Sequence, residues 1–359
     1  EAGDRRAANA YYAAALRIAT ARPSTDSAIV RDVQPRRQLY MIRNRENAMR
    51  KYLVTAAVLA LSVTATPDCA DANGDLKALV DSYWADVLKE APIFASSLGI
   101  DTYARDVGDY SLAASDRRAS MAALFLKKLQ AIPQAELDAA SKVEAGILAR
   151  SLNSTIEGNR FGQRAINFTT YSSWHQSFAG MANNLPFKSK ADFESYNARL
   201  AQYGQVNAQN IEVANVAIRG KYTQPCETLN GFEATITGLI APDPRKARHF
   251  GPYLQSRPDG ISAAEFEGLA NEAAKTIETV IYPALRQQLD WYVKSYKPAC
   301  AKAPGISAQP GGAAFYDFRI REETTTNLNA EEIHAIGLTE VARIRSEMVE
   351  VARKAGFDS

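Results

Sequence analysis

Residues Gly311 to Arg343 read GGAAFYDFRIREETTTNLNAEEIHAIGLTEVAR and carry the strongest local signals of this 359-residue chain. The two glycines at its start permit a tight turn, because glycine adopts backbone conformations that other residues avoid. From Phe315 to Ile320 the aromatic residues alternate roughly as in a strand. Asn329 and Glu332 then have the spacing of a capping box at the start of a helix. The stretch therefore predicts a short strand followed by a well-capped helix.

Helical periodicity dominates the chain before this stretch. Apolar residues recur three and four positions apart, as on one face of a helix, in the segments 76–88, 115–131, 134–156, 190–219 and 262–296. Ser115 and the pair Ser262 and Glu265 are the expected caps, and Pro283 should kink the last helix. We therefore predict a mainly α fold, a large irregular helical domain over residues 73–359 with a small β element near residues 309–326.

A secretory signal peptide is predicted at residues 49–72. Met49 opens a short basic region, Leu53 to Ala65 is an apolar run of 13 residues, and small residues precede Asn73. A buried core helix is the alternative interpretation of this run, which is too short to span a bilayer as a helix. Residues 1–48 hold nine Arg and no Lys, and we interpret them as a disordered upstream extension. A segment with a role of its own is the alternative.

The composition excludes some partners. The net charge is +2, and without residues 1–72 the chain has 31 basic against 33 acidic residues. No basic patch suggests a nucleic-acid partner. After removal of the signal peptide, no stable membrane span is expected, and the protein should be exported to the periplasm or the extracellular space.

Cys226 and Cys300 are the two cysteines that remain after residue 72. In an oxidising compartment, two cysteines most simply pair, so a Cys226–Cys300 disulfide is predicted. Two separate buried thiols are the alternative. Two cysteines without suitably spaced histidines do not make a zinc site.

Candidate substrate-binding residues lie in the stretch quoted above. They are Tyr316, Arg319, His334, Glu340 and Arg343. Glu340 falls within or beside the apolar stripe of its helix, so it should find a partner, and Arg343 is three residues away. The pair either forms a structural ion pair between helices or faces a cleft. The strand could bind an extended peptide at its edge, or be a plain hairpin, and His334 could be a half-buried structural residue.

The sequence offers no familiar catalytic motif. It has no His-Glu-x-x-His, no Gly-x-Ser-x-Gly and no phosphate-binding glycine loop. Of the other histidines, His175 and His249 lie in the long segments 157–189 and 221–261, which are expected to be loops. We interpret His175 as a partly exposed loop residue and His249 as part of a cationic surface, with a pocket position for His175 as the alternative. No catalytic residue and no metal ligand is therefore assigned.

Several segments together resemble the bacterial family known as domain of unknown function 885. They are Pro92–Gly99 (PIFASSLG), Phe193–Tyr203 with its Tyr-x-x-Arg-Leu pattern, Gly220–Pro225 (GKYTQP), Pro310–Tyr316, Thr324–Thr326 and, most specifically, Glu332–Arg343. The resemblance covers most of residues 73–359. It implies an exported or lipid-anchored relative of helical zinc peptidases, with a His-Glu-x-x-x-Gly-His-His motif downstream of residues 332–343.

This sequence does not contain that downstream motif. The resemblance therefore implies the N-terminal portion of an exported zinc-dependent peptidase-like hydrolase, truncated at its C-terminus, with zinc and a peptide substrate belonging to the full-length protein. On this view the fragment alone is inactive. The alternative is a non-enzymatic periplasmic helical protein that binds a peptide or another envelope ligand.

Overall fold

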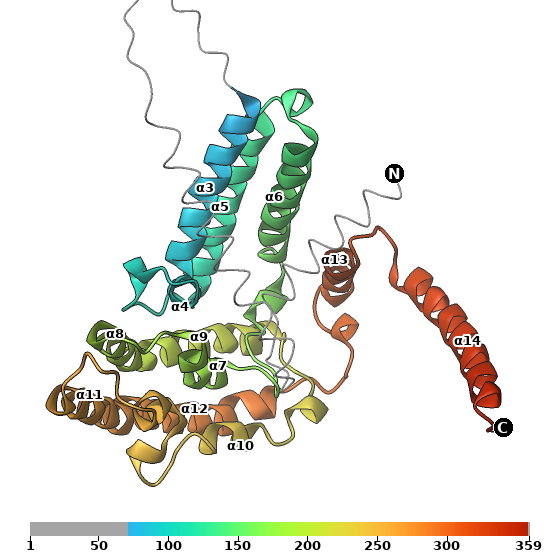
Figure 1. Ribbon diagram of the computed structural model, residues 1–359. Helices are drawn as coiled ribbons and strands as arrows, with labels where there is room; N and C mark the ends of the chain where they lie inside the picture. The colour runs from blue at the N-terminus through green and yellow to red at the C-terminus, as the bar shows by residue number, and fades with distance from the viewer. Residues whose placement is uncertain (1–70, 358–359) are drawn as a thin grey trace, which may run out of the picture. The chain divides into compact units, whose positions relative to one another are not determined.

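The computed structural model describes residues 71–357, and these residues form an all-α structure (Figure 1). Its α-helices are α3 (Ala72–Glu90), α4 (Pro92–Ser97), α5 (Leu112–Ala131), α6 (Ala139–Gly158), α7 (Trp174–Gly180), α8 (Lys190–Ala201), α9 (Tyr203–Gly220), α10 (Phe232–Thr237), α11 (Ala263–Thr276), α12 (Tyr282–Trp291), α13 (Gly312–Thr324) and α14 (Ala330–Lys354). Short 3-10 turns link many of them, and a single isolated β-bridge joins Pro225 and Ala301 within the described residues. The mainly α prediction is confirmed.

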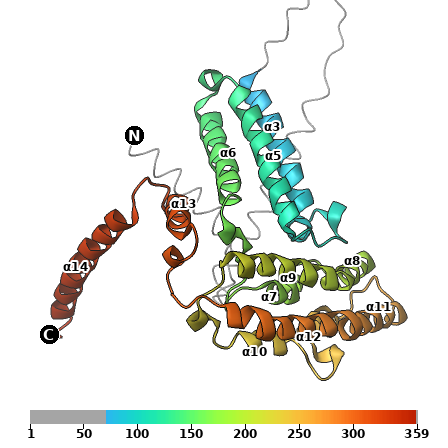
Figure 2. The ribbon, with the colours of Figure 1, turned by 180° about the vertical axis from the view of Figure 1, so that it is seen from behind.

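Helices α3, α5 and α6 pack side by side, and both Figure 1 and Figure 2 show this arrangement. Apolar residues from all three helices fill their common core, including Leu76, Phe125 and Leu152. The sequence located these helices but misplaced one cap. Helix α5 begins at Leu112, and the Ser111 hydroxyl, not that of Ser115, accepts the hydrogen bond from a first-turn N–H group.

A larger core lies among α7 to α12 and is rich in aromatic side chains. Its buried members include Phe168, Trp174, Tyr203, Phe232 and Tyr292. The helix predicted at residues 190–219 is two helices, α8 and α9, which meet at residue 202. Ring-to-ring contacts join separate segments within this core, such as Phe168 with Phe232 and Phe178 with Tyr203.

One nearly continuous helical run extends from α11 through α12. Ser262 and Glu265 form the predicted capping box at its start. Before Pro283 the backbone widens into a π-helical segment, Ile277–Ile281. Proline lacks the N–H group that would continue the α-helical pattern, and π-bulges are a common adjustment inside helices. Where a kink at Pro283 was predicted, the structure thus has a π-helical segment that ends two residues before the proline.

The predicted β element near residues 309–326 is wrong, because residues 312–324 form helix α13. Gly311 starts it with a left-handed φ of 65°. Phe315 and Phe318, three residues apart and so on one helical face, both pack on the Phe161 ring, with centroids 5.5 and 5.4 Å away. The apparent alternation of aromatic residues was a helical face combined with an exposed Tyr316.

The predicted upstream extension, residues 1–48, lies outside the described residues, as does the predicted signal peptide except for its last two residues. Ala72 starts α3 and is buried. No helix between residues 71 and 357 is both long and apolar enough to cross a bilayer.

Candidate functional site

The five residues predicted to bind substrate lie on two helices. Tyr316 and Arg319 are on α13, and His334, Glu340 and Arg343 are on α14. All five are exposed, and none of them lines the pocket described below. Arg319 forms an ion pair with Glu323 one turn further along its own helix.

The predicted contact between Glu340 and Arg343 is present. Arg343 Nε and Nη2 donate to Glu340 Oε2 over 3.0 and 2.7 Å, and its Nη1 donates to Glu347. Both partners of the pair lie on α14 and are about half exposed. The pair therefore stabilises one helix and does not connect two, and exposed pairs of this kind contribute less than about 1 kcal/mol.

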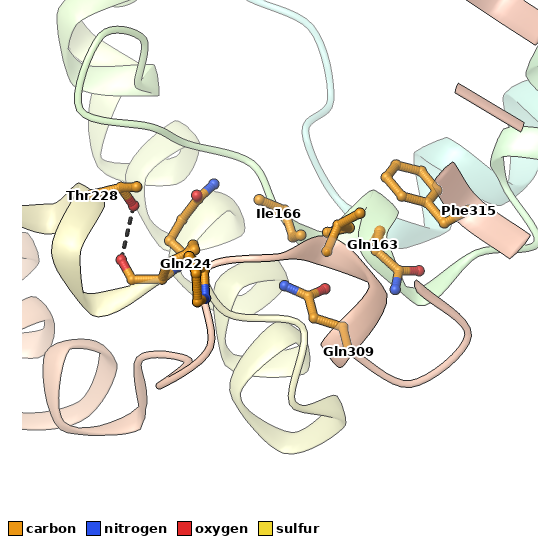
Figure 3. A pocket seen from close by; sticks show the side chains of 9 residues that line it. Gln163, Ile166, Gln224, Thr228, Gln309 and Phe315 are labelled. Carbon is orange, nitrogen blue, oxygen red and sulfur yellow. Dashed lines mark hydrogen bonds between the residues drawn. The ribbon is translucent and has the colours of Figure 1, made fainter. Parts of the chain in front are cut away.

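A pocket of about 430 Å³ lies where three distant segments of the chain meet (Figure 3). Its lining residues are Gln163, Ile166, Gln224, Pro225, Thr228, Pro304, Ile306, Gln309 and Phe315. They come from the turn after α6, from the segment between α9 and α10, and from the segment before α13 together with its first turn. The volume falls in the range of small-ligand sites in proteins.

Three glutamine side chains hold these segments together. Each donates its amide N–H to a backbone carbonyl of a distant segment: Gln163 to Pro310 (3.0 Å), Gln224 to Phe168 (2.8 Å) and Gln309 to Thr223 (2.9 Å). In the view of Figure 3 the Gln309 amide lies between Gln224 and Gln163. In these bonds each amide uses one of its two N–H donors.

Gln309 stands out among these glutamines. Its side chain is buried, with the residue 8% exposed. Its Oε1 atom has no hydrogen-bond partner in the described part of the chain. Leaving a buried acceptor unpaired costs about 1–3 kcal/mol. A donor that entered the pocket could remove this penalty.

The predicted disulfide between Cys226 and Cys300 is confirmed and lies beside the pocket, with a Cα–Cα distance of 5.0 Å. Cys226 N donates to Ala301 O, and Ala301 N donates to Gln224 O, both over 2.9 Å. The disulfide and this bridge tie the wall at residues 224–228 to the segment that leads into the wall at residues 304–309. The shape of the pocket thus depends on a covalent link.

Both histidines are buried, contrary to expectation. His175, predicted to be a partly exposed loop residue, lies on α7, and His249, predicted on a cationic surface, lies in the 3-10 helix Arg248–Leu254. His175 Nδ1 lies 2.7 Å from Gln288 Nε2, and its Nε2 lies 2.9 Å from Thr235 Oγ1. The ring nitrogens of His249 have no partner in the described part of the chain. Burial lowers the pKa of His175 and that of His249 to about 4. Both rings are therefore neutral at pH 7 and act as packing groups.

The described residues do not fit a zinc site. Between residues 71 and 357, no three or more His, Cys, Asp or Glu side chains are grouped so that they could hold a metal ion. Both cysteines among the described residues are in the disulfide, and His334 is exposed on α14, whereas His175 and His249 are buried. No catalytic step through zinc is derived from these residues.

Comparisons with known proteins identify the family. The model of the family described as "Bacterial protein of unknown function (DUF885)" matches residues 92–359, which is most of the chain. The chain therefore belongs to this family. No protein in the curated set matches it significantly.

A solved structure shares the fold. The crystal structure of a candidate lipoprotein from Colwellia psychrerythraea superposes with a TM-score of 0.70 at 19% sequence identity. The match covers 80% of this chain and 52% of that protein. The chain thus spans about half the length of this relative.

The pocket glutamines were not identified from the sequence. Gln224 lies inside the segment Gly220–Pro225, and Gln309 directly precedes Pro310, so both lie within or beside segments that carried the family resemblance. No spacing rule connects Gln163, Gln224 and Gln309, because each belongs to a different loop or turn.

Proposed function

We propose that this chain is the N-terminal portion of an exported, zinc-dependent, peptidase-like hydrolase. In this proposal residues 72–357 help to bind substrate, and residues outside the chain hold the zinc. Membership in the family supports the proposal, because the resemblance of residues 332–343 to this family implies a relationship to helical zinc peptidases. If zinc binds in the full-length protein, it would supply an activated water for hydrolysis.

The pocket is the observation that carries the substrate-binding part of the proposal. Its polar lining consists of neutral amides and a hydroxyl, with no ionisable side chain among the lining residues. Such groups complement the N–H and C=O groups of a peptide backbone, which are strong and uncharged hydrogen-bonding groups. Apolar residues in the same lining can contact side chains.

Export is supported by the disulfide between Cys226 and Cys300. Disulfides form and persist in oxidising compartments such as the bacterial periplasm. The solved relative from Colwellia psychrerythraea is described as a candidate lipoprotein, which suits a location in the cell envelope.

The test uses the protein expressed from the complete gene and purified from the periplasm. We expect bound zinc by elemental analysis, and cleavage of a mixed peptide library that stops with a chelator and returns when zinc is added. A protein that holds no zinc and cleaves no peptide would refute the hydrolase proposal.

The second candidate function is a non-enzymatic envelope protein that binds a peptide or another ligand. The pocket favours it, because every polar group in the lining is suited to binding and none to proton transfer at neutral pH. Peptide binding by the complete protein, without zinc and without cleavage, would establish this alternative.

A further inference from the structure

We infer that the pocket between the disulfide and α13 binds an uncharged segment of peptide in an extended conformation. The inference deepens the proposed function by naming the ligand class of a specific site, and it holds equally for the binding-protein alternative. Five of the nine lining residues are apolar: Ile166, Pro225, Pro304, Ile306 and Phe315. The remaining four carry amide or hydroxyl groups.

The buried Gln309 oxygen gives the pocket a directional group. Its own N–H is engaged by the Thr223 carbonyl at 2.9 Å, which fixes the orientation of the amide. The oxygen is left as an acceptor without a partner in the described structure. A peptide N–H group is a donor of the right polarity. Binding would therefore pair an acceptor that is unpaired in the free protein, which favours the bound state.

Charge should determine which peptides bind. No lining side chain is ionisable, so a charged residue entering the pocket would lose its hydration without gaining an opposite charge. Neutral peptides should therefore bind more tightly than peptides of equal length with Asp or Lys at the centre. The mixture of apolar contacts with isolated amides suits alternating backbone and side-chain groups, so a peptide is favoured over an oligosaccharide.

The rim of the pocket allows a test that leaves buried groups untouched. Thr228 is exposed, and its hydroxyl donates only to the nearby Pro225 carbonyl, over 2.8 Å. Thr228→Trp would place an indole in the pocket from the solvent side. Thr155 is a matched control, since it is exposed on α6 and its hydroxyl donates to a carbonyl four residues earlier.

A second variant addresses the amide acceptor. Gln309→Met keeps the length of the side chain and removes both the unpaired acceptor and the donor to the Thr223 carbonyl. We expect binding about fivefold weaker, as for the loss of a neutral hydrogen bond. Gln287→Met is the control, because Gln287 is exposed on α12. Equal melting temperatures among the variants would show that each one folds.

The probe is the peptide acetyl-Ala-Val-Ala-Ala-amide, titrated into the full chain by calorimetry with a chelator present throughout. We expect saturable binding by the unmodified chain and by Thr155→Trp, with at least tenfold weaker binding by Thr228→Trp. The peptides with central Asp or Lys should also bind at least tenfold more weakly.

Four outcomes would overturn the inference. They are no binding of the neutral peptide up to millimolar concentration, equal binding by Thr228→Trp, equal binding of the charged peptides, and tighter binding of maltotriose than of the peptide. Because metal is excluded, failure of the hydrolase proposal would leave these results unchanged. Conversely, zinc-dependent cleavage by the complete protein without binding here would reject only this pocket.

Discussion

Replacing Arg199 should destabilise the fold more than replacing any exposed arginine. Arg199 is on α8 and is only 2% exposed. Its Nε atom donates to the Asp106 carbonyl over 2.8 Å, and its Nη2 atom lies 2.8 to 3.2 Å from the Ser96 hydroxyl and from the carbonyls of Pro92 and Tyr103. One guanidinium thus holds the segment at residues 92–106 against α8.

The expected loss of stability in Arg199→Met follows from the buried carbonyl and hydroxyl groups that lose their hydrogen-bond donor. Hydrogen bonds from charged donors contribute about 1.5–3 kcal/mol each. These contributions are not additive, and the native protein has already lost free energy by removing the guanidinium from water. Removing one partner of a buried charged interaction typically costs about 3–5 kcal/mol, and we expect that range here. Arg199→Lys keeps the charge but loses the planar fork of donors, so it should lose roughly half as much stability as Arg199→Met.

Urea unfolding at pH 7, followed by circular dichroism, measures the free energy of unfolding. Hydrogen exchange of residues 92–106 would show local opening of the segment that Arg199 holds. Arg219→Met is the matched control, because Arg219 is 62% exposed and pairs only with Glu212. It should change stability by less than about 1 kcal/mol. If Arg199→Met destabilised no more than Arg219→Met, the clamp would not stabilise the fold.

Three further predictions concern the disulfide, the buried histidines and one glycine. The double variant Cys226→Ala with Cys300→Ala should lose about 2–4 kcal/mol in urea unfolding, because the bond closes a loop with a sequence separation of 74; an unchanged midpoint would contradict this. The pKa values of His175 and His249 are lowered to about 4 in the fold, against an ordinary value near 6.5 in the unfolded chain. The unfolded chain therefore binds more protons between these values, and stability should fall as pH drops from about 6.5 to about 4, by up to about 3 kcal/mol per histidine. His249→Phe should flatten this decline in pH-dependent thermal melts, and an equally steep decline would refute the assignment. Gly312→Ala should destabilise by at least about 1 kcal/mol, since an added Cβ would lie 1.8 Å from a backbone carbonyl oxygen; a melting temperature equal to that of the unmodified chain would reject this.

The sequence predicted elements well where local signals and tertiary packing agree. The stripe of α3 and the capping box at Ser262 are examples, because the periodicity and the cap belong to the same element. It failed at residues 315–320, where Tyr316 and Phe318, two apart, fit the alternation of a strand, while Phe315 and Phe318, three apart, fit a helical face. Contact with Phe161, more than 150 residues earlier in the chain, decides between the two. A local pattern does not contain that contact.

The pocket could not be predicted for a related reason. Its glutamines act on carbonyls of distant segments: the bond from Gln309 to Thr223 spans 86 positions, and that from Gln163 to Pro310 spans 147. A glutamine in a loop has no local signature that separates such a role from simple solvation. The two cysteines were different, because the chemistry of their compartment restricts them to few states. The sequence therefore predicted the covalent link beside the pocket but not the pocket.

Helix α14 shows which structural features hydrophobic periodicity predicts and which it does not. Its cap at Asn329 and its apolar stripe were predicted, and the helix is present. Along the stripe, however, Ile336 is 51% and Val341 is 52% exposed, and no side chain of α14 is buried. Periodicity identifies the apolar face of a helix, but the surface that covers this face is a property of other segments. For the same reason Glu340 was correctly expected to have a partner, whereas its burial could not be inferred: Arg343 satisfies it from the same helix, in solvent.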